Sequence, residues 1–392
     1  MSNLGKILLC LLLALAGCST APRQPRSPRA PDWNSPDTVK PAPEAAQPAP
    51  PPAPVPVPAP SYTNSYAATW ISLARWSREN GCGSLRQISF APLPTFALTT
   101  SNGILILHAN SLVAKWDGLE LHLGFAPQLI GGQPFVHVLD LEKNIEPLLY
   151  DFSLPTKTNR VIVIDPGHGG VNGGTTNVLD NTAEKELTLD WARRLAALLA
   201  TNGWEVFLTR TNDVDVSLSN RVAFTEEQKA DLFISLHFNS AAPNQEQAGL
   251  ETFCLTPTGM PSTLTRGYDD DVSLAFPNNA FDAENLQYAL RLHRALLQMN
   301  RMADRGVRRA RFLTVLRGQN RPAVLIEGGY LSNPREARRI SDPAYRQKLA
   351  VAVARALTER SEAGSQKSEA GPPTSSLQPM APSLSAPTSH GR

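Results

Sequence analysis

The pattern of apolar and polar positions across residues 158–362 is typical of a sheet covered by helices. Short runs rich in branched apolar residues predict buried strands at VIVID, EVFLT, LFISLHF, LETFCLTP, FLTVL and AVLIE. Between them, apolar residues recur at helical spacing, as in the segment 183–203, which ends at a glycine. Further helices are predicted through Arg221 to Gln228, from Glu284 to about Met302, and from Pro343 onward. The alternation predicts an α/β domain with a mostly parallel, twisted sheet and helices on both faces.

A shorter pattern precedes this domain, in residues 62–154. TWISLARWSRENG carries apolar residues at helical spacing, and two later stretches alternate around SNG and GG turns, which predicts hairpins. The stretch is therefore expected to form a small α+β domain. Its three histidines are predicted to be half-exposed strand residues, because none has a carboxylate close by in the sequence: His108, His122 and His137.

The first 18 residues have the features of an export signal. Lys6 precedes an apolar run that is too short to span a membrane and suits the core of a signal peptide. LAGC, ending at Cys18, resembles the bacterial lipobox, whose cysteine is lipidated and becomes the new N-terminus. Ser19 at the next position resembles an outer-membrane sorting signal of Gram-negative bacteria. The alternative is an ordinary signal peptide with a chance cysteine.

Two further segments have compositions that cannot form a core. Many of the 34 prolines fall in residues 19–61, a Pro/Ala-rich stretch that favours extended conformations and is expected to act as a semi-rigid tether. Residues 363–392 are rich in Ser, Pro and Ala and are expected to be disordered. The net charge of +2 gives no electrostatic reason to expect a nucleic-acid partner.

Two of the four cysteines remain once the signal peptide and the lipidated residue are set aside. Cys82 and Cys254 lie in different segments, so two separate thiols are favoured, although an exported pair could form a disulfide. The chain has no CxxC motif, which argues against a cysteine zinc site.

Polar residues with metal-binding chemistry stand at the ends of three predicted strands. His168 follows VIVID, His237 ends LFISLHF, and Glu327 ends AVLIE. Glu184 lies in the first turn of the helix after the glycine-rich loop. Ligands of such sheets collect at the carboxyl ends of strands, and two imidazoles with one carboxylate form a common catalytic zinc set. A second carboxylate would serve as general base. Spacing alone leaves a metal site and separate structural roles equally open.

Several ordered motifs resemble the zinc-dependent N-acetylmuramoyl-L-alanine amidases. They are DPGHGG at 165–170, AEKELTLDWA at 183–192, ADLFISLHFNS at 230–240 and PAVLIEGGYLSNPRE at 322–336, with TR at 209–210, SNRV at 219–222 and DRGV at 304–307 in the same order. Residues 62–154 resemble the copper-amine-oxidase N-terminal-like domain through their NG-turn hairpins and the rhythm around Gly132 to Asp140. That second resemblance implies neither copper nor an enzymatic role.

The amidase resemblance implies a complete site. His168, Glu184 and His237 match the zinc ligands, and Glu327 matches the catalytic glutamate. The implied reaction is zinc-dependent hydrolysis of the amide bond between N-acetylmuramic acid and L-alanine in peptidoglycan. A lipid anchor at the outer membrane would place the protein in the periplasm. The sequence departs from the family at Phe238, where a small residue is usual, and its ring is expected to crowd or line the cleft. It also departs in EGG at 327–329, where EtG is common.

Other residues carry weaker expectations. Asp165 is either an outer-shell partner of His168 or a turn residue, and Asn239 and Arg305 either touch substrate or brace loops. Arg308, Arg309 and Arg311 form a basic run that is either solvated surface or a contact for stem-peptide carboxylates. Residues 257–283 are expected to form a substrate-contacting loop rather than an autoinhibitory helix. Two rival functions remain: cleavage of another wall peptide bond, and wall binding without catalysis. A protein activator is neither implied nor excluded.

Overall fold

The computed structural model describes residues 69–150, 152, 154, 159–265 and 270–359. The predicted signal peptide 1–18 with Cys18, the linker 19–61, the start of the 62–154 domain and the tail 363–392 lie outside these residues. Among the described residues, no helix is both long and apolar enough to cross a membrane.

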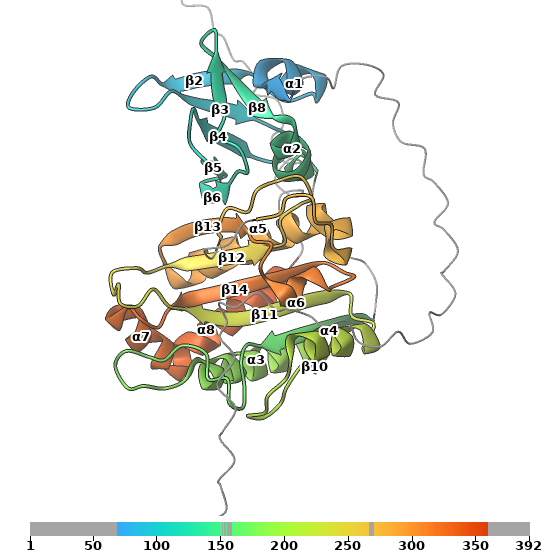
Figure 1. Cartoon of the computed structure of the whole chain (residues 1–392), viewed down its shortest axis with the longest axis vertical. Coiled ribbons are helices and arrows are strands. Elements are labelled where there is room, and N and C mark those ends of the chain that lie inside the picture. Colours follow the sequence, from blue (N-terminus) through green and yellow to red (C-terminus); the bar gives the residue numbers. More distant parts are fainter. Residues whose placement is uncertain (1–68, 151, 153, 155–158, 266–269, 360–392) are drawn as a thin grey trace, which may run out of the picture. The chain divides into compact units, whose positions relative to one another are not determined.

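Six strands form the sheet of the α/β region. They are β9 (Arg160–Pro166), β10 (Trp204–Leu208), β11 (Leu232–Asn239), β12 (Leu250–Cys254), β13 (Asp304–Arg309) and β14 (Ala323–Tyr330), in the order β10-β9-β11-β14-β12-β13 (Figure 1). All neighbours pair in parallel except β12 with β14. The prediction of a mostly parallel sheet is therefore confirmed.

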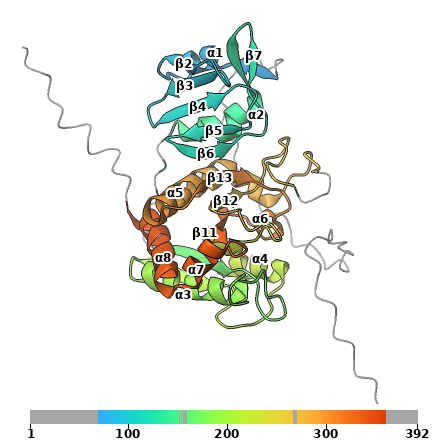
Figure 2. The same ribbon diagram turned by 90° about the vertical axis from the view of Figure 1, so that its left-hand side faces the viewer.

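Helices cover both faces of this sheet (Figure 2). One face carries α3 (Glu184–Ala200), α5 (Asp282–Asn300) and α8 (Pro343–Thr358), and the other carries α4 (Leu218–Glu227) and α6 (Thr314–Arg317). Alternate residues of β9 serve the two layers: Ile162 and Ile164 pack into the first core, and Val163 packs into the second. The period of two in a doubly buried strand explains why VIVID is apolar throughout.

Part of the predicted element order was wrong. FLTVL was expected to be a strand, but its second half is α6, whose Val315 and Leu316 are buried against the second face. The strand in this part of the chain is β13, in the polar sequence DRGVRR. Two short helices were also missed, η3 (Pro277–Phe281) and α7 (Pro334–Ser341). A short apolar run has no period long enough to separate a helical turn from a strand.

The N-terminal residues form strands and short helices. A meander contains β2 (Leu85–Ser89), β3 (Thr95–Thr99), β4 (Ile104–His108), β5 (Val113–Trp116) and β6 (Leu119–His122), so the SNG hairpin is confirmed. A second sheet has the order β1-β8-β7, with β1 (Trp70–Ser72), β7 (Gln128–Ile130) and β8 (Gln133–His137). The helical segments are α1 (Leu73–Glu79), α2 (Val138–Asp140), η1 (Leu141–Ile145) and η2 (Glu146–Leu148).

The meander joins the α/β sheet through β6, which pairs in parallel with β13 and makes one eleven-stranded sheet. The Asp304 carboxylate accepts a hydrogen bond from the Glu120 backbone N–H at 2.9 Å. Arg309, only 1% exposed, donates to the carbonyl of Lys143 at 2.9 Å and to the side chain of Asn144 at 3.2 Å. A buried guanidinium therefore connects β13 to η1.

Two sequence expectations about histidine and cysteine have clear outcomes. His122 and His137 are buried rather than half exposed, and burial together with Arg308 lowers the pKa of His122 to about 4. Cys82 and Cys254 are both free thiols, as the separation of their segments indicated.

Candidate metal centre and active site

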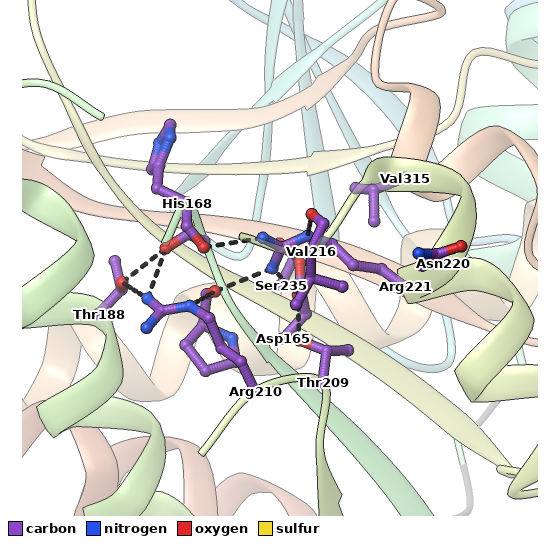
Figure 3. A network of polar contacts seen from close by, with 12 residues as sticks. Asp165, His168, Thr188, Thr209, Arg210, Val216, Asn220, Arg221, Ser235 and Val315 are labelled. Carbon is purple, nitrogen blue, oxygen red and sulfur yellow. Dashed lines mark hydrogen bonds and ion pairs between the residues drawn. The ribbon is translucent and has the colours of Figure 1, made fainter. Parts of the chain in front are cut away.

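His168 stands on a turn that the preceding strand and two arginines hold in place. The residue has a left-handed backbone, φ +63°, which side chains other than glycine seldom adopt. Arg221 donates to the carbonyl of His168 at 2.7 Å, and Arg210 donates to the carbonyl of Gly167 at 2.8 Å (Figure 3). Such strain is typical of functional sites, where the surroundings compensate its cost.

Asp165 anchors this bracing from inside the sheet. Its carboxylate is 1% exposed and accepts hydrogen bonds from Arg221 (2.5 Å), Ser235 (2.8 Å) and Thr209 (2.5 Å) (Figure 3). Burial would raise the pKa of Asp165, but Arg221 and the two hydroxyls hold it below its usual range. Of the two roles left open by the sequence, these contacts describe a loop anchor that reaches the His168 backbone through Arg221.

Three side chains meet beside this loop. Glu184, the first residue of α3, places Oε2 3.0 Å from His168 Nε2 and Oε1 3.0 Å from His237 Nδ1. The two imidazole rings are 4.8 Å apart and nearly perpendicular. One donor atom from each of the three side chains lies within 4.8 Å of the others. The structure therefore brings together the three residues whose types and positions predicted a metal site.

Neighbouring groups fix the orientation of these side chains. His168 Nδ1 lies 3.0 Å from the Asn172 side-chain oxygen, which directs Nε2 toward Glu184. Glu184 also accepts backbone hydrogen bonds from Thr175 (3.1 Å) and Phe238 (3.0 Å). Burial opposes the charge of Glu184, yet the two imidazoles hold its pKa well below the usual range. The carboxylate is thus kept ionised, as a metal ligand must be.

The donor set fits zinc. Ligand atoms 2.0–2.2 Å from a tetrahedral zinc ion stand roughly 3.3 Å apart. Here each imidazole lies 3.0 Å from one of the two Glu184 oxygens, and one donor atom from each residue lies within 4.8 Å of the others. Two neutral nitrogens and one carboxylate leave the fourth position open, as in catalytic rather than structural sites. The hydrogen bond from the second nitrogen of His168 is the outer-shell contact that such ligands usually make.

Two glycines leave the space that these ligands occupy. A Cβ at Gly167 would stand 2.2 Å from Cε1 of His237, and one at Gly174 would stand 2.5 Å from Oε2 of Glu184. Gly174 also has a left-handed φ of +71°. Of the glycines in DPGHGG, Gly167 is therefore required by the second imidazole rather than by a turn.

Glu327 lies one strand away from the ligand cluster. In the sheet register, His237 of β11 faces Glu327 of β14, and Glu327 faces Glu251 of β12. Residues in register on adjacent strands point to the same face, with strands about 4.8 Å apart. The row therefore places a second carboxylate beside the three-residue cluster, as a general base requires.

Glu251, which the sequence analysis did not single out, contacts both Asn239 and Arg305. Its buried carboxylate accepts from Asn239 at 2.7 Å and from Arg305 at 3.2 Å, so both predicted substrate or bracing residues are placed next to Glu327. Tyr330 and Arg308 bind it as well. Arg309 and Arg311, in contrast, are buried away from solvent. No local sequence signal marks Glu251 or Asn172, because the partners of Glu251 are distant in the sequence and the contact of Asn172 with His168 depends on the conformation of the loop.

The two departures from the family pattern are physically linked. Phe238 is 2% exposed and packs against Trp191, so its ring lies in the first core and not in the cleft, as had been expected. A Cβ at Gly328 would stand 2.8 Å from Trp191 and 3.1 Å from Phe238. The first glycine of EGG, Gly328, therefore makes room for the large residue that follows His237.

Comparison with known proteins decides the family. The profile of the N-acetylmuramoyl-L-alanine amidases matches residues 162–359, about half of the chain. The chain belongs to this amidase family. All three ligand candidates and Glu327 fall within the matched range. The amidase AmiC of Escherichia coli O6:H1 is 29% identical over 55% of this chain and 56% of its own length. The sporulation-specific amidase of Bacillus subtilis is 32% identical over 50% of this chain and 67% of its own.

Solved structures of amidases align with about half of the chain. The N-acetylmuramoyl-L-alanine amidase from Clostridium difficile 630 has 28% identity and a TM-score of 0.43, and covers 51% of this chain and 96% of its own. The amidase AmiC2 of Nostoc punctiforme has 29% identity and a TM-score of 0.42, covering 50% and 94%. The aligned part of this chain spans little more than half of the length of its Escherichia coli relative AmiC.

Proposed function

We propose that this amidase uses zinc to hydrolyse the amide bond between N-acetylmuramic acid and L-alanine in peptidoglycan. The observation that carries the proposal is the position of Glu327, one strand from the cluster of His168, Glu184 and His237. Relatives named N-acetylmuramoyl-L-alanine amidases support the choice of bond.

The chain's own residues would perform binding, orientation and proton transfer. His168, Glu184 and His237 would hold Zn²⁺, which when bound supplies Lewis acidity that lowers the pKa of water and polarises a carbonyl. Glu327 would take the proton of the attacking water and return it to the nitrogen of L-alanine as the amide bond breaks. Glu184 stays ionised throughout, whereas Glu327 must gain and lose a proton, so the two carboxylates have separate roles.

The setting of the enzyme extends the proposal. A lipid anchor at Cys18 and an extended linker would tether the catalytic region to the periplasmic side of the outer membrane, within reach of peptidoglycan. Cleavage of another wall peptide bond and wall binding without turnover remain the alternatives. The first differs in the ends released, and the second would show bound zinc without hydrolysis.

Substitution of Glu327 tests the mechanism. Glu327→Gln should retain its fold and one zinc ion per chain, and should lose hydrolysis of purified sacculi by roughly 100-fold or more, because only the proton acceptor is removed. His168→Ala should lose zinc together with activity. The exposed Glu227→Gln on α4 makes the same charge change away from the site and should keep both. Full activity in Glu327→Gln would remove the general-base assignment.

A further inference from the structure

Beyond Glu327, five side chains form a compact polar group, here called the Glu251 cluster: Glu251, Asn239, Arg305, Arg308 and Tyr330. The Glu251 carboxylate is 3% exposed, accepts hydrogen bonds from Asn239 (2.7 Å), Tyr330 (2.9 Å) and Arg305 (3.2 Å), and forms an ion pair with Arg308 (3.1 Å). These partners come from β11, β13 and β14. A buried carboxylate with three donors and a further ion pair is covered by its own partners and acts as an anchor.

The charges of this cluster do not cancel. Two guanidinium groups face one carboxylate, which leaves a net charge of +1. Arg305 donates its Nε–H to Glu251, and Arg308 donates its Nε–H to the Arg305 carbonyl while pairing with Glu251. Each guanidinium has four more N–H donors. The side chains of Arg305 and Arg308 are 26% and 16% exposed, whereas Glu251 is covered. The positive ends therefore remain accessible to an anion, and their stems are fixed by the anchor and by stacking of Arg305 on Tyr330.

The cluster lies at a suitable distance from the reacting atoms. Glu251 is in register with Glu327, and β13, which carries both arginines, is the next strand. The guanidinium groups thus stand one to two strand spacings, roughly 5–10 Å, from Glu327. In an extended peptide, a carboxylate on the residue after the scissile L-alanine is roughly 6–7 Å from the scissile nitrogen. The two lengths match.

We propose that Arg305 and Arg308 form a subsite for a carboxylate of the leaving peptide, on the residue that follows L-alanine. The inference rests on the proposed function, because it takes Glu327 as the point where the bond breaks. Planar guanidinium groups bind carboxylates through paired hydrogen bonds. The subsite selects wall peptides with an acidic second residue over those in which that group is an amide.

A different role for the two arginines would be to offset the charge of Glu327. The two roles predict different effects on the kinetic constants of the two substrates. Charge compensation affects every substrate alike and appears in kcat, whereas a peptide subsite acts only on the acidic form and appears mainly in KM.

The test uses the full-length protein and uncross-linked glycan strands in two forms that differ in one group, a carboxylate or an amide on the second residue. The wild-type protein should cleave the acidic form with a kcat/KM roughly 10–100-fold higher. In Arg305→Gln with Arg308→Gln the ratio should fall close to one, chiefly through KM. The single variant Arg305→Lys, which keeps the positive charge, should retain part of the kcat/KM preference for the acidic form.

The controls distinguish a failure of the subsite proposal from a failure of the proposed amidase function. Arg338→Gln, an exposed residue of α7, removes the same charge elsewhere and should leave both rates and their ratio unchanged. Melting curves establish that each variant is folded. Equal cleavage of both forms by the wild type, or an equal loss on both forms in the double variant, overturns the subsite and leaves the amidase function standing. Cleavage of neither form by the wild type overturns the function itself.

Discussion

The backbone and the ring of His168 are each held in place by a neighbouring side chain. Its left-handed backbone costs on the order of 1–3 kcal/mol, and it persists because Arg221 holds the carbonyl and Asn172 holds the ring. Gly167 beside it does not have a left-handed φ. It is needed because a Cβ at this position would overlap the His237 ring. At this scale, one missing methyl group decides whether two imidazoles can approach one metal ion.

The first prediction concerns that space. Gly167→Ala would bring a methyl group 2.2 Å from the His237 ring, which must then move by about 1 Å. Since displacements of this size cost on the order of 100-fold in rate, activity on sacculi should fall by that factor, with weaker zinc binding by calorimetry.

Gly173→Ala is the matched control for this prediction. It lies in the same loop, has no left-handed φ, and its Cβ would meet only Ala183 at 3.7 Å. The control should behave like the wild type. Equal activity of Gly167→Ala and Gly173→Ala would contradict the steric account.

The sequence could indicate the four candidate residues because each one ends or follows a strand or begins a helix, where the direction of the chain fixes the position. It did not identify Asn172 or Glu251. Asn172 depends on a loop conformation, and Glu251 depends on the order of strands, which sequence spacing does not determine. Asp165 and Phe238 were noticed, but their roles follow from which face of the sheet each side chain points to.

At the scale of elements, α4 acts on the site without contacting a ligand side chain. Arg221 projects from α4 to Asp165 at the end of β9 and to the backbone of the turn. The segments TR and SNRV, noted only as part of the family resemblance, supply Thr209, Arg210 and Arg221 for this bracing. Their function could not be derived from the sequence, since it consists of contacts to backbone carbonyls.

The second prediction tests this brace through pH. In the wild type, the pKa of Asp165 is held below 3.8, so its stabilising contribution is present at neutral pH and is lost as pH falls through the folded-state value. Arg221→Gln leaves a buried carboxylate without its cation, which costs about 3–5 kcal/mol. Burial then raises the pKa of Asp165, so protonation relieves the variant at acid pH.

The measurement is the melting temperature of both proteins between pH 4 and pH 8. The deficit of Arg221→Gln relative to the wild type should be largest at neutral pH and should shrink toward pH 4. The exposed Arg338→Gln should show no deficit. A deficit that is constant across this range would exclude the Asp165 pair as its cause.

The prediction of elements was wrong where a polar segment forms a strand or a short apolar segment forms a helix. DRGVRR is a polar segment, yet it forms β13, because Asp304 and Arg305 bond to neighbouring strands and Arg309 bonds to η1. FLTVL has the pattern of a strand, yet its second half forms a helical turn that covers the second core. Tertiary partners decide such short segments, and they lie far away in the sequence.

At the scale of the whole molecule, the N-terminal strands continue the catalytic sheet. Residues 62–154 were expected to form a separate small domain, and their domain boundaries remain a prediction. The pairing of β6 with β13 and the contacts of Arg309 with η1 nevertheless make strand β13, which carries the Glu251 cluster arginines, dependent on that part of the chain.

The third prediction follows from this dependence. Deletion of residues 62–154 would expose β13 as an edge strand and leave the buried Arg309 without two of its partners. The loss of about 3–5 kcal/mol should lower the melting temperature by on the order of 10 °C. Arg309→Met in the full chain should show a smaller decrease. An unchanged melting temperature after deletion would indicate an independent localisation or binding module.

The central claim is that this chain is a metal-dependent amidase acting on the muramoyl–L-alanine bond. The most direct test is mass spectrometry of purified sacculi digested by the full-length protein, with a chelator, without it, and with zinc restored. The account predicts release of stem peptides with a free L-alanine amino terminus, loss of that product with the chelator, and its return with zinc. Release of different ends, or cleavage that persists in the chelator, would contradict it.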